Sequence, residues 1–303
     1  FIASTGIRTE MRRANDLGIA IDPSQAAVAL PQIHARVKSL AQDQSADIAA
    51  RVRSVGVELI AGRGEMIDTQ LGMAAHRIRA TLANGSERIL DADVVLIATG
   101  ASPRVIKGAE PDGERILNWR QLYDLDALPE HLIVVGSGVT GAEFVSAYTE
   151  MGVKVTAVSS RDRVLPHEDE DAALVLEDAF NERGVTLAKH ARADSVERTE
   201  TGVIVKLSDG RTVEGSHALM TVGSVPNTSG LGLENVGIEL DRGGFLRVDR
   251  VSRTPIQGIY AAGDITGLLP LASVAAMQGR IAMYHALGQA VTPIKLKTVA
   301  SAV

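Results

Sequence analysis

The pattern of hydrophobic and polar positions divides the chain into segments of different character. The first 60 residues carry apolar side chains at helix-like spacing and predict mainly helix, with a short strand at 57–60 and a turn at 62–64. Residues 76–97 predict strands, because apolar and polar positions alternate and Asn84-Gly85 is a strong hairpin turn.

From residue 129 onward, short apolar strands alternate with amphipathic helices. Strands are predicted at 132–135 and 153–158, with helices at 140–151 and around 174–180. This alternation is typical of a parallel, doubly wound α/β sheet. Further strands are expected at 203–207, 212–213, 218–222, 246–248 and 258–262, and helices near 119–123 and at 272–287.

A glycine-rich loop connects the strand at 132–135 to the helix that follows. Its glycines are Gly136, Gly138 and Gly141. The first permits a tight turn, the second lets a pyrophosphate approach the backbone, and the third lets the helix pack close to the sheet. Because the loop lies between a buried strand and a helix, it predicts a dinucleotide site, the alternative being a structural turn.

The end of the strand at 153–158 bears on which dinucleotide binds. NAD sites usually carry an acidic residue there, whereas this chain has Ser159, Ser160 and Arg161. Hydroxyls and a guanidinium suit a 2′-phosphate, so we expect NADPH rather than NADH. The alternative is that Arg161 and Arg163 belong to an ordinary solvated loop.

Three further strings do not belong to a single Rossmann domain. The first contains Thr99-Gly100, the second ends in Gly263-Asp264, and the third begins a helix near Leu271-Ala272. A strand, a glycine and an acid before a helix would let Asp264 accept hydrogen bonds from a polyol. The N–H groups that begin the next helix could donate to a carbonyl or a phosphate.

Together these strings resemble the pyridine nucleotide-disulfide oxidoreductase family of flavoproteins, in the family's order and over essentially the whole chain. Residues 131–166 and 249–287 look very similar to its lipoamide-dehydrogenase-like NAD(P)H quinone reductases from actinobacteria. The resemblance implies two Rossmann-like dinucleotide-binding domains, with an FAD domain split around an inserted NAD(P) domain. The implied segments are 1–128 and 249–292 for FAD, 129–248 for NAD(P), and 293–303 as the opening strand of a C-terminal dimerisation domain.

The resemblance also implies roles for individual residues. NAD(P)H would contact Gly136, Gly138, Val139, Gly141 and Gly223, besides Ser159, Ser160 and Arg161. FAD would contact Gly64, Thr99, Gly100, Gly263, Asp264, Leu271 and Ala272. Glu143 matches a family glutamate near the flavin, where it pairs with a lysine that we expect just before Phe1, although the helix dipole alone would favour a carboxylate there.

The function that the resemblance implies is an FAD-dependent oxidoreductase. It would transfer hydride from NAD(P)H to flavin, and electrons onward to a quinone-like acceptor. One alternative is a dihydrolipoyl dehydrogenase or related disulfide reductase whose redox cysteines precede Phe1. Another is a nucleotide-binding fragment without turnover, because the first FAD glycine loop and the dimerisation domain lie outside these residues.

The composition of the chain argues against several other kinds of site and partner. The chain has no cysteine, so its own residues supply no disulfide and no thiolate metal site, and we expect no metal. A net charge of −6 argues against nucleic-acid binding, and no apolar run reaches the roughly 18 residues of a membrane helix. We expect a cytoplasmic protein, truncated at both ends here, that forms a homodimer at full length.

Overall fold

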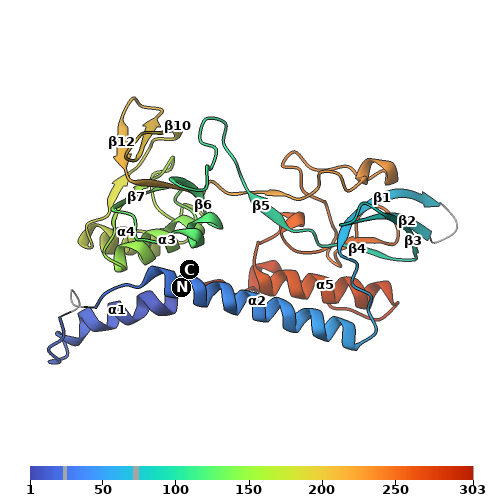
Figure 1. Ribbon diagram of the computed structural model, residues 1–303. Helices are drawn as coiled ribbons and strands as arrows, with labels where there is room; N and C mark the ends of the chain where they lie inside the picture. Colours follow the sequence, from blue (N-terminus) through green and yellow to red (C-terminus); the bar gives the residue numbers. More distant parts are fainter. Residues whose placement is uncertain (23–25, 71–74, 303) are drawn as a thin grey trace. The chain divides into compact units, whose positions relative to one another are not determined.

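The structure, a computed structural model, describes residues 1–22, 26–70 and 75–302 (Figure 1). Its contacts divide the chain into two compact units. One contains Phe1–Ile48 and Pro103–Gly223, and the other contains Ala49–Ser102 and Ser224–Ala302. The expected division after residues 128 and 248, with a cofactor assigned to each domain, stays a prediction.

A parallel five-stranded sheet forms the centre of the first unit. Its strand order is β6-β13-β7-β8-β9, and all neighbouring strands are parallel. The expected parallel α/β sheet is therefore confirmed. Its strands are β6 (Ile116–Asn118), β7 (His131–Val135), β8 (Lys154–Val158), β9 (Thr186–Ala188) and β13 (His217–Met220).

Strand β7 is buried on both faces of this sheet. Leu132 and Val134 belong to one hydrophobic cluster, and Ile133 and Val135 belong to another. Successive side chains of a strand point to opposite faces, so a strand between two cores reads as a continuous apolar run. This is the physical reason why the sequence identified β7 correctly.

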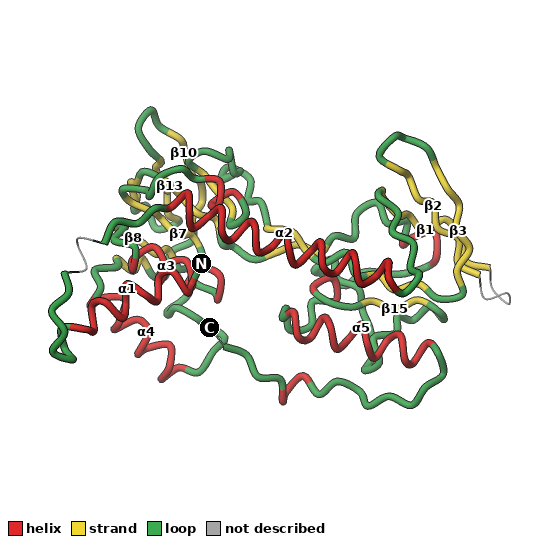
Figure 2. Tube along the Cα trace, turned by 60° about the horizontal axis from the view of Figure 1, so that its bottom comes forward, coloured by secondary structure: helices red, strands yellow, loops and turns green. Residues whose placement is uncertain are grey.

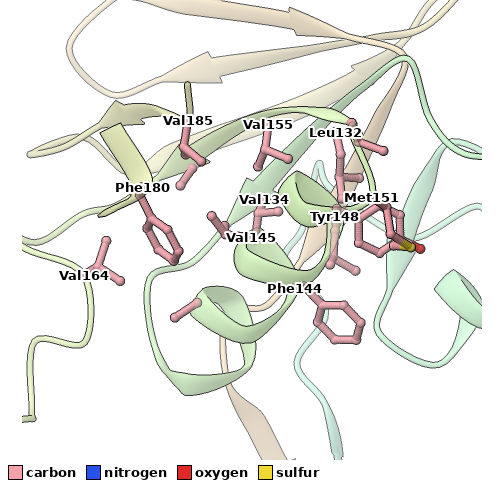
Figure 3. Packing of buried hydrophobic residues seen from close by; sticks show 14 of the residues in the cluster. Leu132, Val134, Phe144, Val145, Tyr148, Met151, Val155, Val164, Phe180 and Val185 are labelled. Carbon is pink, nitrogen blue, oxygen red and sulfur yellow. The ribbon is translucent and has the colours of Figure 1, made fainter. Parts of the chain in front are cut away.

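Helices α3 (Val139–Glu150) and α4 (Glu170–Glu182) contribute to the first cluster. Phe144 and Tyr148 of α3 lie in it together with Phe180 of α4 (Figure 3). The second cluster joins the opposite face to an antiparallel sheet of β10 (Ala193–Arg198), β11 (Val203–Leu207) and β12 (Thr212–Gly215).

The N-terminal helices complete the first unit. Helix α1 (Ile2–Ala14) packs beside α3 (Figure 2), and the Phe1 ring lies 6.0 Å from that of Phe144. The long helix α2 (Leu30–Ser54) begins in this unit and ends in the second. A short 3-10 helix, η2 (Gln121–Asp124), matches the expected helix near 119–123.

The second unit combines short sheets with one long helix. Strands β1 (Gly62–Gln70), β2 (Ala75–Leu82) and β3 (Glu87–Ala92) form an antiparallel sheet, while β4 (Val95–Ile97) and β15 (Ile259–Ala261) are parallel neighbours. Strand β14 (Ser224–Pro226) pairs with β5 (Ala101–Pro103), whose last residue belongs to the first unit. The remaining elements are α5 (Ala272–Ala286) and the 3-10 helices η3 (Leu233–Val236), η4 (Asp264–Thr266) and η5 (Leu296–Thr298).

Four local expectations were wrong. Residues 57–60 form no strand, and the expected turn at 62–64 lies inside β1. A side chain on Gly62 would overlap the carbonyl oxygen of Thr81, so this glycine serves the close approach of two strands rather than a turn. Residues 246–248 contribute only an isolated bridge, and 293–302 contain η5 instead of a strand, while residue 303 lies outside the described residues.

The core beneath α4 gives a first prediction. Phe180 is fully buried, whereas Leu174 on the same helix is 45% exposed. We expect Phe180→Ala to lower the free energy of unfolding by about 3–5 kcal/mol, because it leaves a cavity. Leu174→Ala should change it by less than about 0.5 kcal/mol. Urea unfolding followed by circular dichroism measures both, and equal effects would contradict this account of the core.

Candidate functional site

The turn after β7 brings the first set of expected site residues to the carboxyl edge of the sheet. Gly136 has φ +118°, and a side chain there would overlap Thr221. A side chain on Gly141 would overlap the carbonyl oxygen of Gly136. Both glycines are therefore required by contacts within the protein, and they hold α3 close to the turn.

Gly138 differs from its two neighbours in the motif. Its φ of −73° and ψ of −175° are open to any residue, and no atom lies within 4 Å of an added Cβ. It is the N-cap of α3, and no side chain caps the helix there. Contacts within the protein do not explain why position 138 is a glycine. The free N–H groups and the open space beside Gly138 fit a bound pyrophosphate.

The three residues expected at the 2′-phosphate have different environments. Ser159 is 2% exposed, and its hydroxyl is hydrogen-bonded to that of Ser137 at 2.7 Å. The Arg161 N–H also donates to the Ser159 hydroxyl, at 3.0 Å. Ser159 therefore shapes the turn, whereas Ser160 and Arg161 are exposed and available to a ligand.

The two arginines of this turn are not equivalent. Arg163 is 22% exposed and lies 3.7 Å from Asp162 and 3.6 Å from Glu170. Within the described parts of the chain, the Arg161 guanidinium forms no ion pair. Arg161 is thus the better candidate for a bound phosphate.

Glu143 lies one turn into α3 and is partly buried. Burial raises the pKa of its carboxyl group, and no residue that the structure describes donates a hydrogen bond to it. Burial raises the pKa of Tyr123, and the negative charge of Glu143 adds to that rise. Val139, at the start of the same helix, is 40% exposed.

Gly223 ends the first unit, beyond β13. It has φ +91° and its carbonyl accepts from Arg104 N–H at 2.9 Å. Nothing lies within 4 Å of an added Cβ, so the requirement for glycine here is its left-handed backbone.

In the second unit, the loops after β4 and β15 lie at the same edge of a parallel pair. Gly263 has φ +80° and ψ −157°, a conformation that is essentially restricted to glycine. Asp264 follows it and is half-buried, and its carboxylate accepts no hydrogen bond from the described residues. An unengaged acid at this edge fits a polyol.

Two side chains to which the sequence assigned no role hold these loops. Gln278 of α5, 1% exposed, accepts from Gly263 N–H at 2.7 Å. The Asn227 amide donates to the carbonyl of Thr99 at 2.8 Å, and the Gly100 carbonyl accepts from the Asn227 N–H at 2.9 Å. A glutamine on the buried face of an apolar helix was the available signal for Gln278.

The remaining residues expected to contact FAD lie at the start of α5 and in β1. Leu271 is the N-cap of α5 without a side-chain cap, and Ala272 is its exposed first residue, so N–H groups are free there. Gly64 lies within β1, paired with Ala80. Among the residues described, no cluster of three potential metal ligands occurs, and no helix is long and apolar enough to cross a membrane.

A family model described as pyridine nucleotide-disulphide oxidoreductase matches residues 3–279. The chain belongs to that family. Members of the family use FAD and NAD(P)H, and the open space at Gly138 and the unengaged Asp264 fit these two groups.

Similar proteins within the family agree with this assignment. The chain is 72% identical over 303 residues to a "NAD(P)H dehydrogenase (quinone)" from Mycobacterium tuberculosis, covering 100% of this chain and 62% of that protein. It is 36% identical over 269 residues to a dihydrolipoyl dehydrogenase from Chlorobaculum tepidum, covering 88% of this chain and 56% of the relative.

A crystal structure of LpdA from Mycobacterium tuberculosis matches with a TM-score of 0.93 at 71% identity. The match covers 99% of this chain and 64% of that one. The chain therefore has the fold of that flavoprotein family and spans less than two thirds of the length of these relatives.

The contrast between two glycines gives a second prediction. Gly141→Ala should lower the free energy of unfolding by about 1–3 kcal/mol, because the new methyl group overlaps Gly136. Gly138→Ala should change it by less than about 1 kcal/mol, yet weaken NADPH binding by about 10-fold or more. Thermal melts and calorimetric titration separate the two effects. Unchanged NADPH affinity in Gly138→Ala would contradict the pyrophosphate assignment.

Proposed function

We propose that this chain is the nucleotide-binding part of an FAD-dependent oxidoreductase that uses NADPH to reduce a small quinone-type acceptor. The observation that carries the proposal is the 72% identity, over all 303 residues, with a protein named NAD(P)H dehydrogenase (quinone). FAD and NADPH, when bound, supply the hydride and electron chemistry that protein side chains lack. The task of this chain is then to bind the two groups and to orient them for hydride transfer.

In this proposal the first unit binds NADPH. The N–H groups at the start of α3 and the open face of Gly138 bind the pyrophosphate. Ser160 and Arg161 bind the 2′-phosphate, and the Ser159 hydroxyl holds the backbone of the turn by accepting from the Arg161 N–H. Gly136, Gly141 and Gly223 allow the backbone conformations and the close packing that form this site. The Val139 side chain is partly exposed at the start of α3, where NADPH binds in this proposal.

The second unit binds FAD. Asp264 accepts hydrogen bonds from the ribityl hydroxyls, on a loop fixed by Gly263 and Gln278. Thr99 and Gly100, which Asn227 holds in place, would contact the adenosine side of FAD together with Gly64. The N–H groups at Leu271 and Ala272, which no side chain caps, would donate to the pyrimidine edge of the flavin.

Glu143 is the residue that we assign to the reacting region. Its partly buried position raises the pKa of the carboxyl group, so a nearby cation would stabilise the charged form. A dihydrolipoyl dehydrogenase is the second candidate, supported by the 36% identical relative. The homodimer, the cytoplasmic location and the choice of acceptor remain predictions.

The absorbance spectrum of the purified chain is the first test. We expect a flavin band that bleaches when NADPH is added without oxygen and returns when a quinone is supplied. Because these 303 residues contain no cysteine, the dihydrolipoyl dehydrogenase is tested on the full-length protein, where a bleached flavin band that returns only with a disulfide substrate would favour it. A colourless protein that still binds NADPH would instead support a nucleotide-binding fragment without turnover.

The choice of NADPH is tested at Arg161. Arg161→Ala should weaken NADPH binding by about 1–3 kcal/mol, because a charged hydrogen bond to the 2′-phosphate is lost, and leave NADH binding nearly unchanged. Arg163→Ala is the matched control, since Arg163 is already engaged by Asp162 and Glu170. Titration of each variant with both dinucleotides measures the difference. Equal losses for NADPH and NADH in Arg161→Ala would reject the 2′-phosphate role.

A further inference from the structure

The turn that carries Arg161 is fastened to the end of the neighbouring strand. Ser159 N–H donates to Ala188 at 2.9 Å, and Ala191 N–H donates to Ser159 at 3.1 Å. His190 N–H donates to the carbonyl of Arg161 itself, at 3.2 Å. The position of the Arg161 backbone therefore depends on residues 188–191 as well as on its own turn.

A buried carboxylate joins these same two segments. Glu177 of α4 is 5% exposed, and one of its oxygens accepts from Val164 N–H at 2.7 Å. The other oxygen accepts from Lys189 Nζ at 2.8 Å. Val164 ends the Arg161 turn, and Lys189 directly precedes His190, so one side chain holds both partners of the contact.

The position of Glu177 on its helix makes this arrangement unusual. The buried residues of α4 are Ala173, Glu177 and Phe180, so the carboxylate lies in the middle of the core-facing stripe. Burying a charge costs several kcal/mol unless it is paired and hydrogen-bonded, and an apolar side chain would pack there more easily. A role beyond packing accounts for a charge at this position.

His190 adds a second observation at the same place. It has φ +60°, a left-handed conformation that is uncommon outside glycine and costs about 1–3 kcal/mol. Such a conformation persists only where the surrounding structure determines it. Glu177, through Lys189, and the hydrogen bond to Arg161 are two of the contacts that hold this segment.

We propose that Glu177 is a positioning residue for cofactor selectivity. It fixes the turn at 159–164 against residues 188–191, and thereby holds Arg161 where a 2′-phosphate binds. This inference rests on the proposed function, in which Arg161 recognises NADPH. Glu177 touches no ligand and acts through Arg161 alone.

The chain contains a matched control in Glu150. This residue is also buried, 4% exposed, and its carboxylate lies 2.9 Å from Arg183. It ends α3, which begins at the carboxyl edge of the sheet and runs back toward the amino edge. Glu150→Gln thus disturbs a similar buried pair away from the Arg161 turn.

The test is calorimetric titration of the purified chain with NADPH and with NADH. Glu177→Gln keeps the shape of the side chain, but removes its charge and leaves Lys189 unpaired. We expect the Kd for NADPH to rise by about 10-fold and the Kd for NADH to change by less than about 2-fold. Glu150→Gln should lower the melting temperature while leaving the ratio of the two Kd values unchanged.

A double-mutant cycle separates positioning from general stability. If Glu177 acts through Arg161, then Glu177→Gln should not alter the Kd ratio further in the Arg161→Ala background. Lys189→Met breaks the same link from the other side and decides the matter if Glu177→Gln does not fold. An additional change of the ratio in the double mutant would overturn the inference.

The remaining outcomes are distinguishable from one another. A wild-type chain that binds NADPH no more tightly than NADH would overturn the 2′-phosphate assignment, and the inference with it. A wild-type chain that prefers NADPH, with the same preference in both Glu177→Gln and Lys189→Met, would overturn only the role of Glu177.

Discussion

The close contact between α3 and the turn after β7 is the constraint on which the first unit depends. Gly141 has no side chain, so the helix can lie against the carbonyl oxygen of Gly136. That contact aims the free N–H groups of the helix at the edge of the sheet, and it places Gly138 at their centre. It also fixes the position of Glu143, because Glu143 lies one helical turn after Val139, the first residue of α3.

In both units, buried polar side chains form hydrogen bonds that fix the backbone of a loop, and other groups are left to contact ligands. Ser159 and Glu177 bind N–H groups of the turn after β8, and Gln278 binds the N–H of Gly263. An N–H or carboxylate buried without a partner would cost about 1–3 kcal/mol or more, so these bonds restrict each loop to one conformation. The groups that remain unengaged, Arg161 and Asp264 among them, are those that the proposal assigns to cofactors.

The sequence predicted best where local pattern and tertiary environment agree. The run β7–α3–β8 was identified because both faces of β7 are buried and the glycine loop interrupts the strand at a fixed place. Strand β10 was missed, because a register shift between Ala193 and Ser195 breaks the alternation by which strands are recognised. The roles of Asn227 and Glu177 were out of reach for another reason. Their partners are set by the fold, and Asn227 bonds to a residue 128 positions away.

The same contrast explains how the glycines should be interpreted. The motif in the sequence assigns Gly136, Gly138 and Gly141 three different tasks, of which only that of Gly138 involves a ligand directly. The structure divides them, because two are needed by neighbouring protein atoms and one is not. At an N-cap, a glycine with ordinary dihedral angles costs only a few tenths of a kcal/mol relative to a capping side chain, and here it serves no close contact within the chain. Its presence at the uncapped start of α3 is best explained by a ligand that must come within contact distance of the backbone.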